Sequence, residues 1–133
     1  MYRKPRYFFL AFGAVHAAAH PVDGGVYPHR RGFIGSSGVE PGDVMLLHCA
    51  GGYPGHDMEA PGIGVVIGTQ TGGSEEAIYY QYFSLDSPVE WDTIKNIPEL
   101  ENCTNFTLAG NWLREISNAS FKKAIAGKQI EWP

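Results

Sequence analysis

Acid–base chemistry is the first possibility that this sequence raises, because a histidine and two carboxylates stand close together near its middle. His56, Asp57 and Glu59 lie in one short segment that is rich in glycine and proline. An imidazole beside a carboxylate can act as a general base, but hydrolysis also needs a nucleophile or a metal placed against it. Ser36 and Ser37 lack the strand–turn–helix context that exposes a nucleophilic serine. A small hydrolase that uses His56, Asp57 and Glu59 is therefore the alternative interpretation, and a protein that is not an enzyme is favoured.

A pair of histidines nearer the N-terminus has the spacing of metal ligands on a helix. His16 and His20 are four residues apart, which places two side chains on one face of a helix. No third ligand has suitable spacing, and alanine-rich helices carry such pairs by chance. Cys49 and Cys103 match no metal-binding spacing and are expected to be reduced, small apolar residues. We therefore expect neither a metal nor another cofactor.

The composition and the charge limit the remaining classes of function. The 133 residues are 44% hydrophobic and 18% charged, which is typical of a globular protein, and we expect a single domain over residues 1–133. Seventeen glycines and nine prolines imply frequent turns, which favours β-structure over a helical bundle. The net charge of −4 excludes a strongly basic coat for nucleic acid. Any contact with nucleic acid must then be a pocket or a local basic patch.

The N-terminal segment has two interpretations. Arg3, Lys4 and Arg6 precede an apolar run at 7–15, and three alanines follow, which imitates a signal peptide. Because the run is rich in aromatic residues rather than leucine, we expect a first core strand instead. No stretch approaches the roughly 20 apolar residues that cross a bilayer. We expect no membrane association and a location in the cytosol.

The elements that must position these side chains are mostly strands. Apolar and aromatic runs bounded by turn residues predict four of them, at Tyr7–Phe12, Val44–Cys49, Ile63–Thr69 and Ala77–Leu85. Ala14–His20 can form two helical turns, which Pro21 would end. Ser117 is a suitable N-cap for a helix at Asn118–Ala126, with Phe121 facing the core. Two long loops, at 14–40 and 50–62, are candidates for function because long loops in small domains are seldom mere connections.

A series of short motifs follows the same order as in one known family. They are the aromatic strand Tyr7–Phe12, the basic pair Arg30-Arg31, the turn Gly42-Asp43, the strand Val44–His48, the return Pro61-Gly62-Ile63-Gly64, and the helix start Ile116-Ser117 with Phe121. Together they resemble the EVE domain, a family of the PUA-like superfamily that is related to the YTH and ASCH domains and to the thymocyte nuclear protein. The family's Ser-x-Pro after the first strand is missing, and Tyr27 stands where the family has a tryptophan.

The resemblance implies both a fold and a partner. The expected fold is α+β, a PUA-like small mixed β-barrel of about five to six strands flanked by short helices. The expected partner is a modified nucleobase or nucleotide within DNA or RNA, such as a methylated or hydroxymethylated cytosine or a methylated adenine. A domain of this kind binds the modified base without chemical change.

Binding an extruded base requires flat rings for stacking and polar groups aimed at the edge of the base. The predicted rings are Phe12, Tyr27, Tyr53 and Trp112. Arg30 and Arg31 are predicted to hold a phosphate, since a guanidinium binds one bidentately. The predicted ligand-binding set is completed by Gly13, His16, His48 and Cys49. Two alternatives stay open: Phe12 and Trp112 can be plain core residues, and the same barrel can bind a small molecule or a protein instead.

Overall fold

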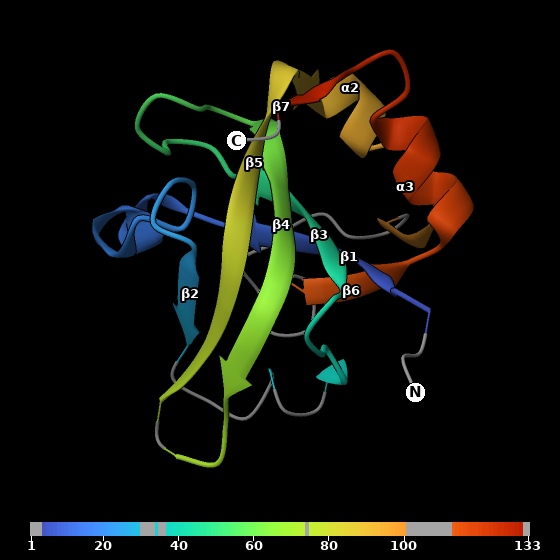
Figure 1. The fold of residues 1–133 in the computed structure, drawn as a ribbon. Coiled ribbons are helices and arrows are strands. Elements are labelled where there is room, and N and C mark those ends of the chain that lie inside the picture. The colour runs from blue at the N-terminus through green and yellow to red at the C-terminus, as the bar shows by residue number, and fades with distance from the viewer. Residues whose placement is uncertain (1–3, 30–33, 35–36, 74, 101–112, 132–133) are drawn as a thin grey trace.

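One mixed sheet of seven strands organises the molecule (Figure 1). The computed structural model describes residues 4–29, 34, 37–73, 75–100 and 113–131. The strands are β1 (Tyr7–Phe12), β2 (Val26–His29), β3 (Val44–Cys49), β4 (Glu59–Gln70), β5 (Glu76–Glu90), β6 (Leu113–Ile116) and β7 (Ile130–Glu131). The helices are short: the 3-10 helices η1 (Ala14–Ala19) and η2 (Pro98–Leu100), and the α-helices α2 (Trp91–Ile94) and α3 (Asn118–Ala124).

The strand order is β2-β5-β4-β3-β1-β6, with β7 pairing beside β2 on the long strand β5. β1 runs parallel to β3 and antiparallel to β6, and the other pairs are antiparallel. No ladder among the described residues joins β2 to β6, so the sheet is open, whereas a closed barrel of five to six strands was expected. The edge of β5 is instead shared by two short strands, β2 along its first half and β7 along its second. The α+β class is confirmed.

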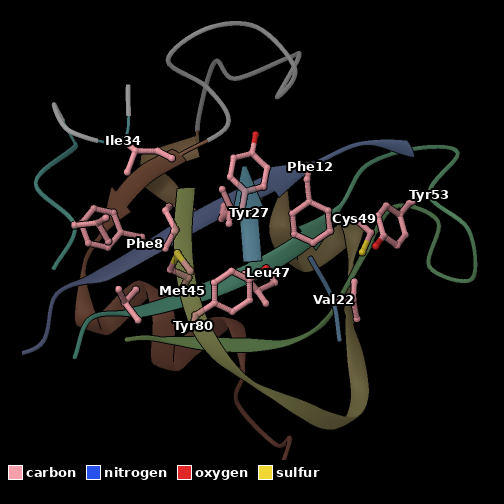
Figure 2. Packing of buried hydrophobic residues seen from close by; sticks show 14 residues of the cluster. Phe8, Phe12, Val22, Tyr27, Ile34, Met45, Leu47, Cys49, Tyr53 and Tyr80 are labelled. Carbon is pink, nitrogen blue, oxygen red and sulfur yellow. The ribbon is translucent and has the colours of Figure 1, made fainter. Parts of the chain in front are cut away.

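Strand β1 lies inside the sheet and is buried on both faces. Its alternating side chains therefore enter two separate cores. Phe8, Leu10 and Phe12 join the first core, which Figure 2 shows with Met45, Leu47, Cys49, Tyr53 and Tyr80. Phe9 and Ala11 join the second core on the opposite face. This pattern confirms the predicted core strand at Tyr7–Phe12.

Helices α2 and α3 cover the second core, while η1 and the β3–β4 loop lie on the other side of the sheet (Figure 1). Helix α3 begins where Ser117 Oγ accepts a hydrogen bond from Ser120 N at 3.0 Å, as its N-cap position predicts. Phe121 is buried, and its ring centroid lies 4.7 Å from that of Tyr7. The predicted helix is thus confirmed, although it ends two residues earlier, at Ala124.

The Gly42-Asp43 turn joins the segments that precede β1 and β3. The buried carboxylate of Asp43 accepts hydrogen bonds from the backbone N–H of Arg6 at 3.0 Å and of Glu40 at 2.9 Å. Gly42 has a φ of +94°, which glycine adopts without steric cost. Arg6 also binds Glu115 of β6 through two of its guanidinium nitrogens. Asp43 therefore joins the start of β1 to the turn before β3, and Arg6 joins it to β6.

Three strands were not predicted: β2, β6 and β7. They are two to four residues long, and β2 contains Pro28. Proline is tolerated there because β2 is an edge strand, whose outer side needs no N–H donor. Among the described residues, none of the helices has the length and hydrophobicity that crossing a bilayer requires.

Candidate functional site

An open pocket with a volume of about 600 Å³ lies on the first face of the sheet, which is the face that carries the first core. It is enclosed by the segment around η1, by the β3–β4 loop and by the middle of β5. Its lining residues are Ala17, His20, Val22, Asp23, Tyr53, Pro54, His56, Glu59, Pro61, Tyr82, Ser84, Leu85 and Pro88. Both long loops singled out by their length therefore contribute to one pocket.

Tyr82 forms the wall of the pocket that belongs to the sheet. It alternates with Tyr80 on β5, so both rings point to the first face, and a glycine of β4 lies against each ring. A Cβ atom on Gly64 would stand 2.7 Å from Cδ2 of Tyr80, and Gly62 makes room for Tyr82 in the same way. Burial raises the pKa of Tyr82 to about 12, so its hydroxyl keeps its proton and can donate a hydrogen bond.

Tyr53, within the β3–β4 loop, also lines the pocket. Its ring packs edge-on against Phe12, with the centroids 5.4 Å apart, as Figure 2 shows. Two backbone hydrogen bonds shape the loop around it, from Tyr53 N to Ala50 O and from His56 N to Tyr53 O, each 3.2 Å long. Burial raises the pKa of Tyr53. This predicted ligand-binding residue lines the pocket.

A hydrogen-bonded imidazole and carboxylate stand on the rim. His56 Nδ1 lies 3.0 Å from Glu59 Oε2, and both side chains are about one-third exposed, at 35% and 29%. Glu59 begins β4 and pairs with Cys49 on one side and with Glu90 on the other. Asp57 has a different role, because its Oδ1 accepts a hydrogen bond from Gly52 N at 2.8 Å and so shapes the loop. Two of the three acid–base candidates therefore meet at the pocket.

The backbone has a left-handed conformation at one non-glycine residue in each of the two loops that form the pocket. Among the described residues, His20 and Met58 are the non-glycine residues with positive φ, at 56° and 55°. His20 lines the pocket, and Met58 lies between His56 and Glu59 in the chain. Such conformations cost free energy and gather at sites where function requires a particular geometry. Of the two, His20 lines the pocket and is also the C-cap residue of η1, whereas Met58 is not among the lining residues.

Four other predicted residues form a group beside the pocket. Gly13 N donates to His16 Nδ1 at 3.3 Å, and His16 Nε2 lies 3.4 Å from the hydroxyl of Tyr27. The ring of Phe12 completes the group, with its centroid 6.2 Å from that of Tyr27. Burial raises the pKa of Tyr27. None of the four lines the pocket. Phe12 packs against Tyr53, which does line it.

His48 and Cys49 point to opposite faces of β3. Cys49 is a buried free thiol of the first core, and burial together with the charge of Glu59 raises its pKa to about 12. His48 lies on the second face, where its ring centroid is 5.5 Å from that of Phe9 and 5.7 Å from that of Trp91. Burial lowers the pKa of His48 to about 4. His48 is therefore separated from the pocket by the sheet.

The remaining predicted residues, Arg30, Arg31 and Trp112, lie outside the described part of the chain. The sequence interpretation missed Tyr82, whose signal was its alternation with Tyr80 opposite the glycines of β4. The paired histidines contact different partners: His16 binds Gly13 and Tyr27, while His20 Nδ1 lies 3.6 Å from Asp23 Oδ1. No group of three metal-ligating side chains occurs within the described ranges.

The open mixed sheet and its short helices define an α+β domain. Comparison with known proteins indicates which α+β fold this is. No family model and no curated protein matches the sequence. The crystal structure of an ASCH protein from Zymomonas mobilis is similar to this chain, with a TM-score of 0.58 and 10% identity over 93% of this chain and 96% of that one. A mutant of the same protein gives a TM-score of 0.59 with 10% identity, over 93% and 99%. A protein from Agrobacterium tumefaciens gives 0.57 with 10% identity, over 90% of each chain.

The chain therefore has the fold of the ASCH protein from Zymomonas mobilis. The PUA-like superfamily and the EVE family stay predictions, because structures that share 10% identity with this chain show the fold alone.

Proposed function

We propose that this chain is a nucleic-acid-binding module that takes one extruded base into the pocket that Tyr53 and Tyr82 line. The pocket itself carries the proposal: it is open, holds about 600 Å³ and is lined by two tyrosines, Tyr53 and Tyr82. Ligand sites span about 300 to 1,000 Å³, and a base that stacks on an aromatic ring gains about 1–3 kcal/mol. The PUA-like fold supports the same class of function.

The pocket favours the base over the phosphate. Its described lining includes the carboxylates of Asp23 and Glu59 and contains neither lysine nor arginine. A phosphate would be repelled there, so the backbone of the nucleic acid must pass outside the pocket. Arg30 and Arg31 are proposed to contact it, in agreement with the need for a local basic patch in an acidic chain.

The resemblance to the EVE domain adds that the base carries a modification. We propose a methylated or hydroxymethylated base, because the pocket volume exceeds what a plain base fills and its lining includes the apolar side chains of Val22, Leu85 and Pro88. A methyl group that contacts these side chains would be removed from water.

Binding of fluorescently labelled single-stranded RNA and DNA, with and without a modified base, tests the proposal by anisotropy. Tyr82→Leu should weaken binding about tenfold or more because it removes a stacking ring. Tyr79→Leu is the matched control, since Tyr79 is on the same strand but points to the other face and is 42% exposed. Absence of binding by the folded protein, or equal losses in both variants, would contradict the proposal. Equal affinity for plain and modified probes would contradict the proposed modification and leave the proposed binding of a base in place.

The contact between His56 and Glu59 favours a second candidate function, hydrolysis of the bound ligand. Glu59 binds Nδ1 of the ring, which is the geometry that orients an imidazole as a general base through Nε2. Mass spectrometry of the probe after incubation distinguishes the two functions. An intact probe supports binding alone, and cleavage that is lost in His56→Gln supports the hydrolase.

A further inference from the structure

We infer that the pocket selects bases that present an exocyclic amino group, with Glu59 as the hydrogen-bond acceptor that makes the choice. This inference rests on the proposed function, and it names the class of base. Cytosine and adenine carry such an amino group, whereas uracil and thymine present a carbonyl oxygen at the same edge.

The acceptor character of the pocket comes from Glu59. Its Oε2 is engaged by His56, and its Oε1 makes no hydrogen bond to the described residues. An ionised carboxylate can only accept, so it attracts an N–H group and repels a carbonyl oxygen. Carboxylates are accordingly a side-chain partner of the amino group of cytosine.

The position of Glu59 is well fixed, which selectivity requires. Strand pairing holds its backbone on both sides, to Cys49 in β3 and to Glu90 in β5. His56 holds the carboxylate itself at 3.0 Å, and His56 is fixed in turn by the hydrogen bond from its N–H to Tyr53 O. His56 is therefore a positioning residue that acts through Glu59.

Tyr53 and Tyr82 determine where the edge of the base can lie. Both tyrosines and Glu59 line the same pocket, so a base that packs against a tyrosine ring brings its edge to the rim where Glu59 stands. Asp23 is the other carboxylate in the described lining of the pocket, and its side chain is 78% exposed, whereas that of Glu59 is 29% exposed. Glu59 is therefore the better shielded of the two carboxylates, and a hydrogen bond to it discriminates more strongly between bases.

The test compares otherwise identical single-stranded RNA probes with one variable base: cytosine, adenine, uracil or N4,N4-dimethylcytosine. The last keeps the ring of cytosine and removes its amino hydrogens. The cytosine and adenine probes should bind about tenfold or more tightly than the other two. If uracil or dimethylcytosine binds as well as cytosine, the inference is overturned and the proposed function stands. If no probe binds, the proposed function fails, and the inference with it.

Two variants locate the selectivity. Glu59→Gln should reduce the preference for cytosine over uracil to about twofold, because a carboxamide can donate to the uracil oxygen as well as accept. Glu90→Gln removes the same charge from an exposed neighbour outside the pocket and should leave the preference unchanged. His56→Gln should lower the ratio of the two affinities through the loss of positioning, whereas a purely structural role would lower both affinities equally. Thermal unfolding confirms that each variant is folded, and an unchanged ratio in folded Glu59→Gln overturns the assignment.

Discussion

The ring of Tyr82 lies directly over the backbone of Gly62, where a Cβ atom would stand 2.6 Å from Cε1 of the ring. The same Cβ would also collide with the carbonyl oxygen of Phe83 on β5. The glycine is therefore required by the position of a pocket wall. The contacts of Gly62 and Gly64 with Tyr82 and Tyr80 explain why the segment Pro61-Gly62-Ile63-Gly64 pairs with an aromatic strand in this chain.

Gly62→Ala should destabilise the protein by about 1–3 kcal/mol, because overpacking forces the ring and the neighbouring strand apart. It should also weaken ligand binding by displacing Tyr82. Gly68→Ala is the control on the same strand, since its Cβ would meet nothing within 4 Å. That variant should lie within about 1 kcal/mol of the wild type or be slightly more stable. Urea unfolding measures both, and equal stabilities would contradict the packing described here.

Asp43→Asn should cost about 1–3 kcal/mol. The buried carboxylate accepts two backbone N–H groups, from Arg6 and Glu40, and the amide nitrogen of asparagine would face one of those donors. Asp86→Asn is the control, because the exposed carboxylate of Asp86 accepts a single hydrogen bond, from Gln129 N at 3.0 Å. A loss in Asp43→Asn no larger than in the control, measured by urea unfolding, would refute this role of the turn.

His48 should make the stability depend on pH. Burial lowers its pKa from 6.5 to about 4, so between these values the folded state binds fewer protons than the unfolded state. The free energy of unfolding should therefore fall as the pH falls through this window, by about 3 kcal/mol in full, and is unaffected by His48 above it. His48→Phe keeps a ring between Phe9 and Trp91 and removes the titration. Chemical denaturation at several pH values should give a flatter profile for the variant; parallel profiles would exclude His48 as the cause.

Ser117→Ala should lower the stability by about 1 kcal/mol through the loss of the N-cap of α3. Ser117 Oγ accepts from Ser120 N, and Glu99 accepts from Ser117 N at 2.6 Å, so the cap also joins α3 to η2. Ser87→Ala is the control: its hydroxyl binds Lys128 Nζ at 3.0 Å on the surface. Thermal unfolding by circular dichroism should show a lower midpoint for the first variant alone.

Much of the fold was predictable because its signals are local. The run Tyr7–Phe12 alternates between two cores, and Ser117 caps a short helix, so neighbouring residues alone indicate both. Strands β6 and β7 give no such signal, since they are short and exist through pairing with distant strands. The closure of the sheet is also a property of distant pairs, and the expected barrel was wrong for that reason.

The candidate site was predictable only in part. Tyr53 stood out because glycines and proline around it leave little core to pack against, and His56 with Glu59 stood out by residue type. Tyr82 was one of several aromatic residues in β5, and its importance depends on which face of the sheet lies under the pocket. Conversely, His48 and Cys49 are neighbours in sequence, and the pleat of β3 sends one of them away from the pocket.

The place of β1 between β3 and β6 has a consequence for how the chain folds during synthesis. Arg6 and Glu115, which join the start of β1 to β6, are 109 positions apart in the chain. A ribosome must therefore have made the chain through β6, which ends at Ile116, before the first strand can acquire its second neighbour. Until then the edge of β1 that β6 will occupy, with its aromatic side chains, has no native partner strand, and this is a state in which chaperones bind or chains associate. Contacts of such long range also slow the search for the native state, so we expect folding in milliseconds to seconds rather than microseconds.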